Sequence, residues 1–137
     1  MKFPTFLAAA LLAGAALDAQ AQAQATAAAD GKTLFAKNCA ACHQANGKGI
    51  PGAFPALAGS GFVQGAPVEV ATVLLKGRGG MPDFSNNLDD AEIAQVLSYV
   101  RTSWGNSAAP LSGQDVSAQR LALGVAPPSR GRFGNKH

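Results

Sequence analysis

Two thiols and an imidazole lie within five consecutive residues, Cys39-Ala40-Ala41-Cys42-His43. Thiols three positions apart can each form a thioether to a haem vinyl group, and the imidazole that follows is then held at one face of the iron. The spacing therefore predicts the covalent attachment of one haem through Cys39 and Cys42, together with one axial ligand, His43.

Two other chemistries use closely spaced cysteines. A thioredoxin-like redox pair is expected in a βαβ setting, and a structural zinc site needs a second pair of Cys or His ligands. The chain has two cysteines in all, and its other histidine is the last residue, His137. These counts favour the haem site over both alternatives.

Residues 1–25 have the composition of a secretory signal. Lys2 supplies positive charge, residues 6–17 are mostly apolar, and residues 19–25 offer overlapping A-x-A cleavage sites. A retained membrane anchor is the alternative, but this apolar run is shorter than the about 20 residues that span a bilayer. The sequence therefore predicts a periplasmic protein with no membrane span after cleavage, and export suits haem attachment outside the cytoplasm.

The net charge of +3 is unevenly distributed along the chain. Residues 26–104 carry equal numbers of basic and acidic side chains, so the excess lies in the tail. A nucleic-acid-binding face would combine Lys and Arg with aromatic residues on the folded body, and we expect no nucleic-acid partner. We expect a haem domain over residues 26–105 and a basic, largely disordered extension over residues 106–137.

Three stretches predict helices, and none shows the alternation of a strand. Asp30 can cap a first helix that leads into the cysteines, and Pro67 begins a second helix that Gly77 ends. Asp89 begins a third, with Glu92 completing a capping box. The apolar stripe of this third helix, which indicates a core-facing side, comprises Ile93, Val96, Leu97, Val100 and Trp104.

Two glycine-rich loops separate these helices. Residues 44–61 contain Phe54 and Leu57 as apolar anchors, which favours an ordered loop around the haem edge over a flexible linker. The second loop contains Gly80-Met81-Pro82, and Met81 is the one methionine besides Met1. Met81 could fill a gap in the core, but its place between Gly and Pro favours ligation of the iron. Arg78, in the same loop, is equally compatible with a haem propionate contact and with a solvated position.

The order of four motifs resembles that of class I cytochromes c. These motifs are C-A-A-C-H, F-P-A-L-A-G-S, G-G-M-P-D-F and Y-V-R, and the resemblance covers about residues 29–104. It implies an all-α cytochrome c fold, with three main helices and glycine-rich loops wrapped around one covalently bound haem c. It also implies that His43 and Met81 bind the iron from opposite sides, that the carbonyl of Pro55 accepts from the haem histidine, and that Leu57 packs on the porphyrin.

The resemblance further implies that Gly31 and Phe35 of the first helix contact Tyr99 of the last. Residues 99–116 resemble single-haem modules associated with periplasmic dehydrogenases and nitrite reductases. The expected function is a periplasmic single-electron carrier, not an enzyme, whose partners are a dehydrogenase, a reductase or a terminal oxidase. The alternatives are a haem-based catalyst or a gas sensor, in which Met81 would be absent or displaced from the iron.

Overall fold

The computed structural model describes residues 31–128, and within this range the chain is helical with no strand. After helical residues 31–38 come α2 (Ala40–His43), α3 (Gly61–Gln64), α4 (Pro67–Lys76), α5 (Asp90–Thr102) and α6 (Gly113–Ala122). Two isolated bridges, Ile50 with Phe54 and Arg78 with Met81, shape the loops. The all-α prediction is therefore confirmed.

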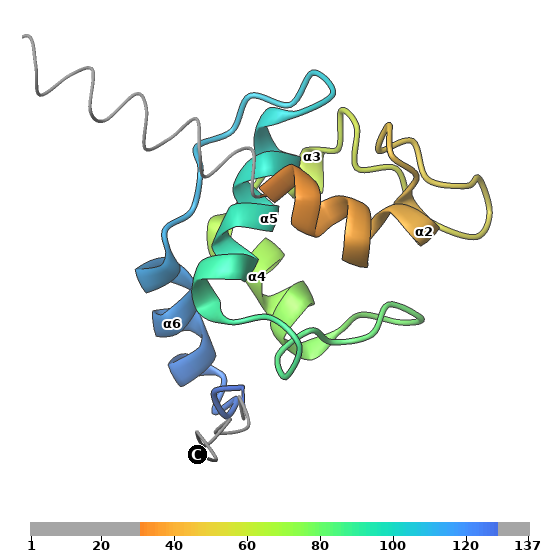
Figure 1. Cartoon of the computed structure of the whole chain (residues 1–137). Coiled ribbons are helices and arrows are strands. Elements are labelled where there is room, and N and C mark those ends of the chain that lie inside the picture. Colours follow the sequence, from red (N-terminus) through yellow and green to blue (C-terminus); the bar gives the residue numbers. More distant parts are fainter. Residues whose placement is uncertain (1–30, 129–137) are drawn as a thin grey trace, which may run out of the picture.

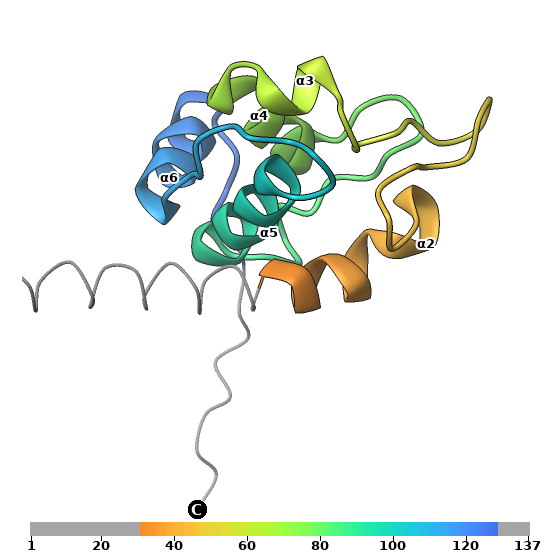
Figure 2. The ribbon, with the colours of Figure 1, turned by 90° about the horizontal axis from the view of Figure 1, so that it is seen from above.

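The helix α5 lies at the centre of the molecule. Figure 2 shows residues 31–38 on one side of α5 and α3 with α4 on the other, while α6 lies at the end away from α2. The buried side chains of α4 and α5 form most of the core, including Leu75 and Ile93. Among residues 31–128, no helix is both long enough and apolar enough to cross a membrane.

The predicted start and end of α4 and the predicted start of α5 are confirmed, whereas Trp104, which the predicted stripe of this helix included, lies beyond its last residue, Thr102. Pro67 is the first residue of α4, and Gly77 ends it with a positive φ of 71°. Asp89 caps α5: its carboxylate accepts from Glu92 N at 2.8 Å, and Glu92 Oε2 accepts from Asp89 N at 2.9 Å. This reciprocal pair satisfies two amides at the helix start. Asp30, the predicted cap of the first helix, lies outside the described residues, as do residues 1–25.

The first helix packs against α5 through Gly31 and an aromatic cluster. A Cβ atom added to Gly31 would clash with the Gln95 carbonyl oxygen and would lie 2.9 Å from the Cβ of Tyr99. The ring centroid of Phe35 lies 5.6 Å from that of Tyr99 and 5.1 Å from that of Trp104. The predicted contact between first and last helices is confirmed, and aromatic pairs at such distances stabilise it.

The prediction of a largely disordered extension from residue 106 is wrong for residues 106–128. Residues 113–122 form α6, which packs against α4 and α5. Ser112 caps this helix in a capping box with Asp115, and Val116 is completely buried. A satisfied helix start and an apolar anchor are sufficient to dock a short helix on an existing core. Residues 129–137 lie outside the described range.

Candidate functional site

A cavity of about 620 Å³ lies between the two glycine-rich loops and the helices. Its walls are mainly apolar, and α5 contributes Val96, Leu97 and Val100. Three of the five residues of the predicted core stripe therefore also line the cavity. In Figure 1 the loop after α4, which carries Met81, lies below α2, and residues of both segments line this cavity.

The two cysteines enter the cavity at the junction of the first helix and α2. The predicted first helix does lead into the cysteines, but the helical conformation is interrupted at Cys39, whose φ and ψ are −123° and −30°. Cys39 N still donates to Phe35 O at 2.8 Å, and His43 N donates to Cys39 O at 3.0 Å. Residues of the following loop hydrogen-bond to His43 at two points: Gly49 N donates to its carbonyl oxygen, and Pro55 O accepts from its ring. These bonds fasten α2 to the loop. Both thiols are free and line the cavity.

The two thiols differ in their surroundings. Cys39 is half-buried and Cys42 is exposed. Burial, and secondarily the charge of Cys42, raise the pKa of the Cys39 thiol to about 11. Before a haem is attached, the Cys39 thiol in this environment therefore lacks the thiolate character of a redox-active cysteine.

The imidazole of His43 is buried and oriented by the loop that follows it. His43 Nδ1 donates to Pro55 O at 2.9 Å, the hydrogen bond that the resemblance implies. A bond at Nδ1 leaves Nε2 as the nitrogen that can bind a metal. Gly49 permits this approach: its φ is 62°, and a Cβ there would meet Phe54 O and, at 2.6 Å, Pro55 O. Gly49 N also donates to His43 O at 2.9 Å.

A tight turn presents Met81 to the same cavity. Arg78 N donates to Met81 O, and Met81 N donates to Arg78 O, both at 3.0 Å. A Cβ on Gly77 would lie 2.7 Å from Met81 O, so this turn requires glycine at position 77. Beyond the turn, Phe84 N donates to Leu74 O at 2.7 Å, which fastens the loop to α4.

All six predicted site residues line this one cavity: Cys39, Cys42, His43, Pro55, Leu57 and Met81. Sequence reasoning missed Phe62, which also lines it and whose ring lies 4.9 Å from the Arg78 guanidinium carbon. Arg78 is thus exposed, and its guanidinium group lies over the face of an aromatic ring. Phe62 lies in α3, a helix of four residues that is too short to show apolar periodicity.

Two buried polar side chains, Arg101 near the end of α5 and Asn106 in the segment after it, hold the cavity walls together, and the sequence reasoning missed both. Arg101 Nη1 donates to Val63 O at 2.7 Å and to Gly65 O at 3.0 Å, so it satisfies carbonyls at the end of α3. Burial lowers the pKa of Arg101. Asn106 Nδ2 donates to Leu57 O at 3.0 Å and to Val100 O at 2.8 Å, which ties the first loop to α5.

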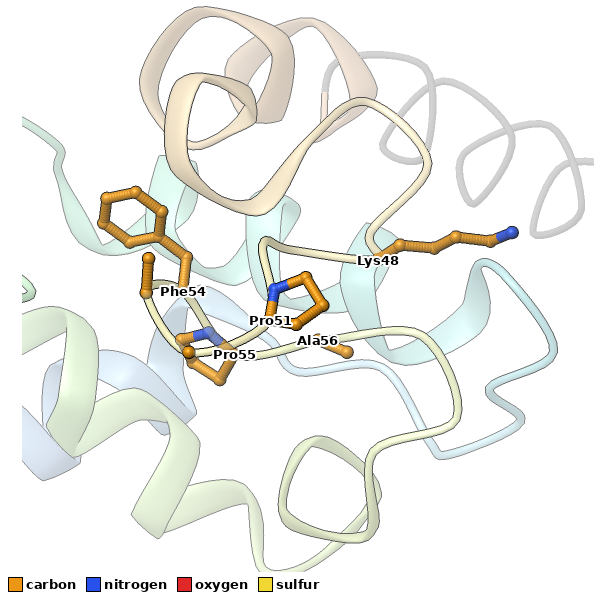
Figure 3. A pocket seen from close by; sticks show the side chains of 7 residues that line it. Lys48, Pro51, Phe54, Pro55 and Ala56 are labelled. Carbon is orange, nitrogen blue, oxygen red and sulfur yellow. The ribbon is translucent and has the colours of Figure 1, made fainter.

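A second, open pocket of about 310 Å³ lies on the first glycine-rich loop. In Figure 3 Pro51, Pro55 and Ala56 lie together on this loop, while Lys48 extends away from it. No Cys, His or Met residue is among those that line it. Of these two pockets, the larger cavity is the one lined by Cys, His and Met side chains.

The larger cavity fits the predicted group. Its apolar walls and volume suit a flat, largely apolar macrocycle, with two attachment thiols and one oriented imidazole at its edge. Within residues 31–128, no three His, Cys, Asp or Glu side chains cluster as a metal site of their own. The donor set is thus suited to a metal held by a macrocycle with axial His and Met ligands.

The sequence is similar to those of known c-type cytochromes. The family described as "Cytochrome C oxidase, cbb3-type, subunit III" matches residues 26–100. Cytochrome c-552 of Thermus thermophilus is 34% identical over 131 residues, covering 71% of this chain and 98% of that protein. Cytochrome c6 of Tetradesmus obliquus is 43% identical over 74 residues, covering 51% of this chain and 83% of that protein.

A third relative is a much longer protein. The cytochrome c subunit of alcohol dehydrogenase (quinone) from Gluconobacter oxydans (strain 621H) is 35% identical over 112 residues. The match covers 72% of this chain but 23% of that subunit.

Proposed function

Because the chain belongs to the class I c-type cytochromes and is a single-haem electron carrier, we propose that His43 and Met81 are the axial ligands of its covalently attached haem c. The haem supplies reversible one-electron exchange between ferric and ferrous iron. The observation that carries the proposal is a single cavity that both attachment cysteines, His43 and Met81 line.

His43 acts through both of its ring nitrogens. The bond from Nδ1 to Pro55 O selects the tautomer in which Nε2 has its lone pair free for the iron. Hydrogen bonding at Nδ1 also increases the electron donation of the imidazole, because partial negative charge develops on the ring. Pro55 and Gly49 therefore orient and tune the ligand without binding the metal.

Met81 supplies the thioether that completes the site. A soft sulfur ligand favours the ferrous state and raises the reduction potential. Bound to the iron, Met81 would also fill the coordination position that an oxygen-activating enzyme must keep open. We therefore propose a carrier rather than an enzyme. In the alternative functions, a haem-based catalyst or a gas sensor, Met81 would be absent or displaced, and the reduced protein would bind carbon monoxide rapidly at neutral pH.

We further propose that the protein acts in the periplasm and exchanges electrons with a dehydrogenase, a reductase or a terminal oxidase. The relatives include cytochrome c subunits of alcohol and gluconate dehydrogenases and a cbb3-type oxidase subunit CcoP. The signal-like composition of residues 1–25 supports export.

The test of the ligand set is spectroscopic. Ferric haem with a thioether ligand has a weak near-infrared charge-transfer band, which we expect in the wild-type protein and in neither Met81→Ala nor Met81→His. Met81→Ala should lower the midpoint potential and open the sixth position, whereas Met81→His should lower the potential and keep the site closed. A wild-type protein without the band, or a Met81→Ala variant with the parent potential, would show that another residue holds the iron.

A further inference from the structure

We infer that α6 is a clamp on the loop that carries Met81, and that Arg120 is the positioning residue of this clamp. The inference rests on the proposed ligation by Met81 for its functional consequence. On this inference, α6, which follows α5, controls how readily Met81 leaves the iron.

Arg120 lies in the last turn of α6, and its residue is only 4% exposed. Its Nε donates to Asp90 Oδ1 at 2.6 Å, at the start of α5. Its Nη1 donates to Ser85 O at 3.1 Å, and its Nη2 to Leu88 O at 3.4 Å. Ser85 and Leu88 belong to the second half of the loop that contains Met81. One guanidinium thus joins α6, the start of α5 and the ligand loop.

The geometry of these contacts requires arginine. The planar guanidinium distributes its donors over three nitrogens, and here all three nitrogens have acceptors. Nη1 also donates to Ala126 O at 2.9 Å, so the chain after α6 closes over the same group. A lysine in this position has one nitrogen, which cannot reach Asp90 and both loop carbonyls together.

The rest of α6 holds Arg120 in place. Val116 is completely buried, and Gln119 Nε2 donates to Thr72 Oγ1 of α4 at 2.8 Å. The capping box at Ser112 begins the helix at a defined residue. Because α6 is fixed against α4 and α5, the loop carbonyls are held by a group that does not move with the loop.

The clamp acts on the loop segment that directly follows Met81. Ser85 is four residues after Met81, and its side chain is already bonded to Asp83 at 2.6 Å. Phe84 N is bonded to α4, so the segment from Asp83 to Leu88 forms one unit with two attachments, α4 and Arg120. Release of the Arg120 attachment should raise the population of the open loop by about tenfold, since hydrogen bonds to charged groups are among the stronger ones.

The experiment compares Arg120→Gln with a matched control, Gln119→Ala, in the full-length haem protein. Both changes remove a hydrogen bond of α6, but the Gln119 side chain donates to Thr72 of α4, whereas Arg120 donates to carbonyls of the loop. Imidazole serves as the probe of the sixth position. We expect Arg120→Gln to bind imidazole about tenfold more tightly than the wild type, and Gln119→Ala to bind it with the wild-type affinity. Arg120→Lys keeps the positive charge but loses the three-nitrogen guanidinium group, so its affinity for imidazole should lie between those of the other two variants.

Hydrogen exchange provides a readout that does not depend on the iron ligand. We expect the Phe84 and Leu88 amides to exchange faster in Arg120→Gln by a similar factor, with no change in Gln119→Ala. Equal effects of the two substitutions, or no effect of Arg120→Gln on exchange, would overturn the clamp. If exchange increases as expected but the wild type lacks the thioether band, the clamp is correct and the proposed ligation by Met81 is wrong.

Discussion

Substitution of Gly31 by alanine tests the contact between the first helix and α5. The Cβ of an alanine would meet the Gln95 carbonyl oxygen and would lie 2.9 Å from Tyr99 Cβ. Neither atom is at the end of a flexible side chain, so the two helices must separate. The separation would also loosen the packing of the Phe35 ring against the Tyr99 and Trp104 rings, now at 5.6 and 5.1 Å.

Two opposing effects determine the size of the change. Alanine favours a helix over glycine by at most about 1 kcal/mol. Overpacking of a close contact costs about 1–3 kcal/mol. Since the contact involves backbone and Cβ atoms, we expect the upper half of that range, and a net loss of about 1–2 kcal/mol in the free energy of unfolding.

Gly61→Ala is the matched control for this substitution. Gly61 is also helical, but a Cβ there would meet nothing within 4 Å. Denaturant unfolding of the haem protein, followed by circular dichroism, should show a lower midpoint for Gly31→Ala and an equal or higher midpoint for Gly61→Ala. A Gly31→Ala protein as stable as the wild type would refute the argument that close backbone approach requires glycine here.

Three further predictions concern charge and the end of the chain. Hydrogen bonds from Ser85 lower the pKa of the Asp83 carboxyl group. The stability that these bonds contribute is present above the ordinary pKa of a carboxyl group and is lost as the pH falls through the lowered pKa of Asp83. Ser85→Ala should therefore raise the pKa of Asp83, which an NMR titration would measure. Removal of residues 129–137 should weaken the salt dependence of electron transfer without changing the melting temperature, whereas removal of 107–137, which includes α6, should lower the melting temperature. Arg101→Gln should destabilise the protein by about 2 kcal/mol in denaturant unfolding, because buried carbonyls of α3 lose their donor.

Most of the site could be predicted because its chemistry depends on local sequence. The cysteines and His43 are adjacent, and Met81 lies between residues that form neither helix nor sheet. Both ends of α4 and the start of α5 could be predicted for the same reason, since Pro67, Gly77 and the Asp89 capping box act within one turn.

The parts that could not be predicted depend on contacts between distant residues. Arg101 and Arg120 look like surface charges, and they are buried because carbonyls from other loops converge on them. The helix α6 has a weak apolar stripe. Its fully buried apolar side chain, Val116, stabilises this helix only because α4 and α5 provide the surface against which α6 packs. Composition indicated a solvated tail, and tertiary packing overrode it.

The size of the cavity couples the stability of the fold to the presence of the cofactor. An unfilled apolar cavity costs about 24 cal/mol per Å³, so 620 Å³ corresponds to an upper figure of about 15 kcal/mol. Small domains have total stabilities of about 5–15 kcal/mol. We therefore expect a chain without its haem to be much less stable than the haem protein, and a larger fraction of such chains to be unfolded and open to proteases.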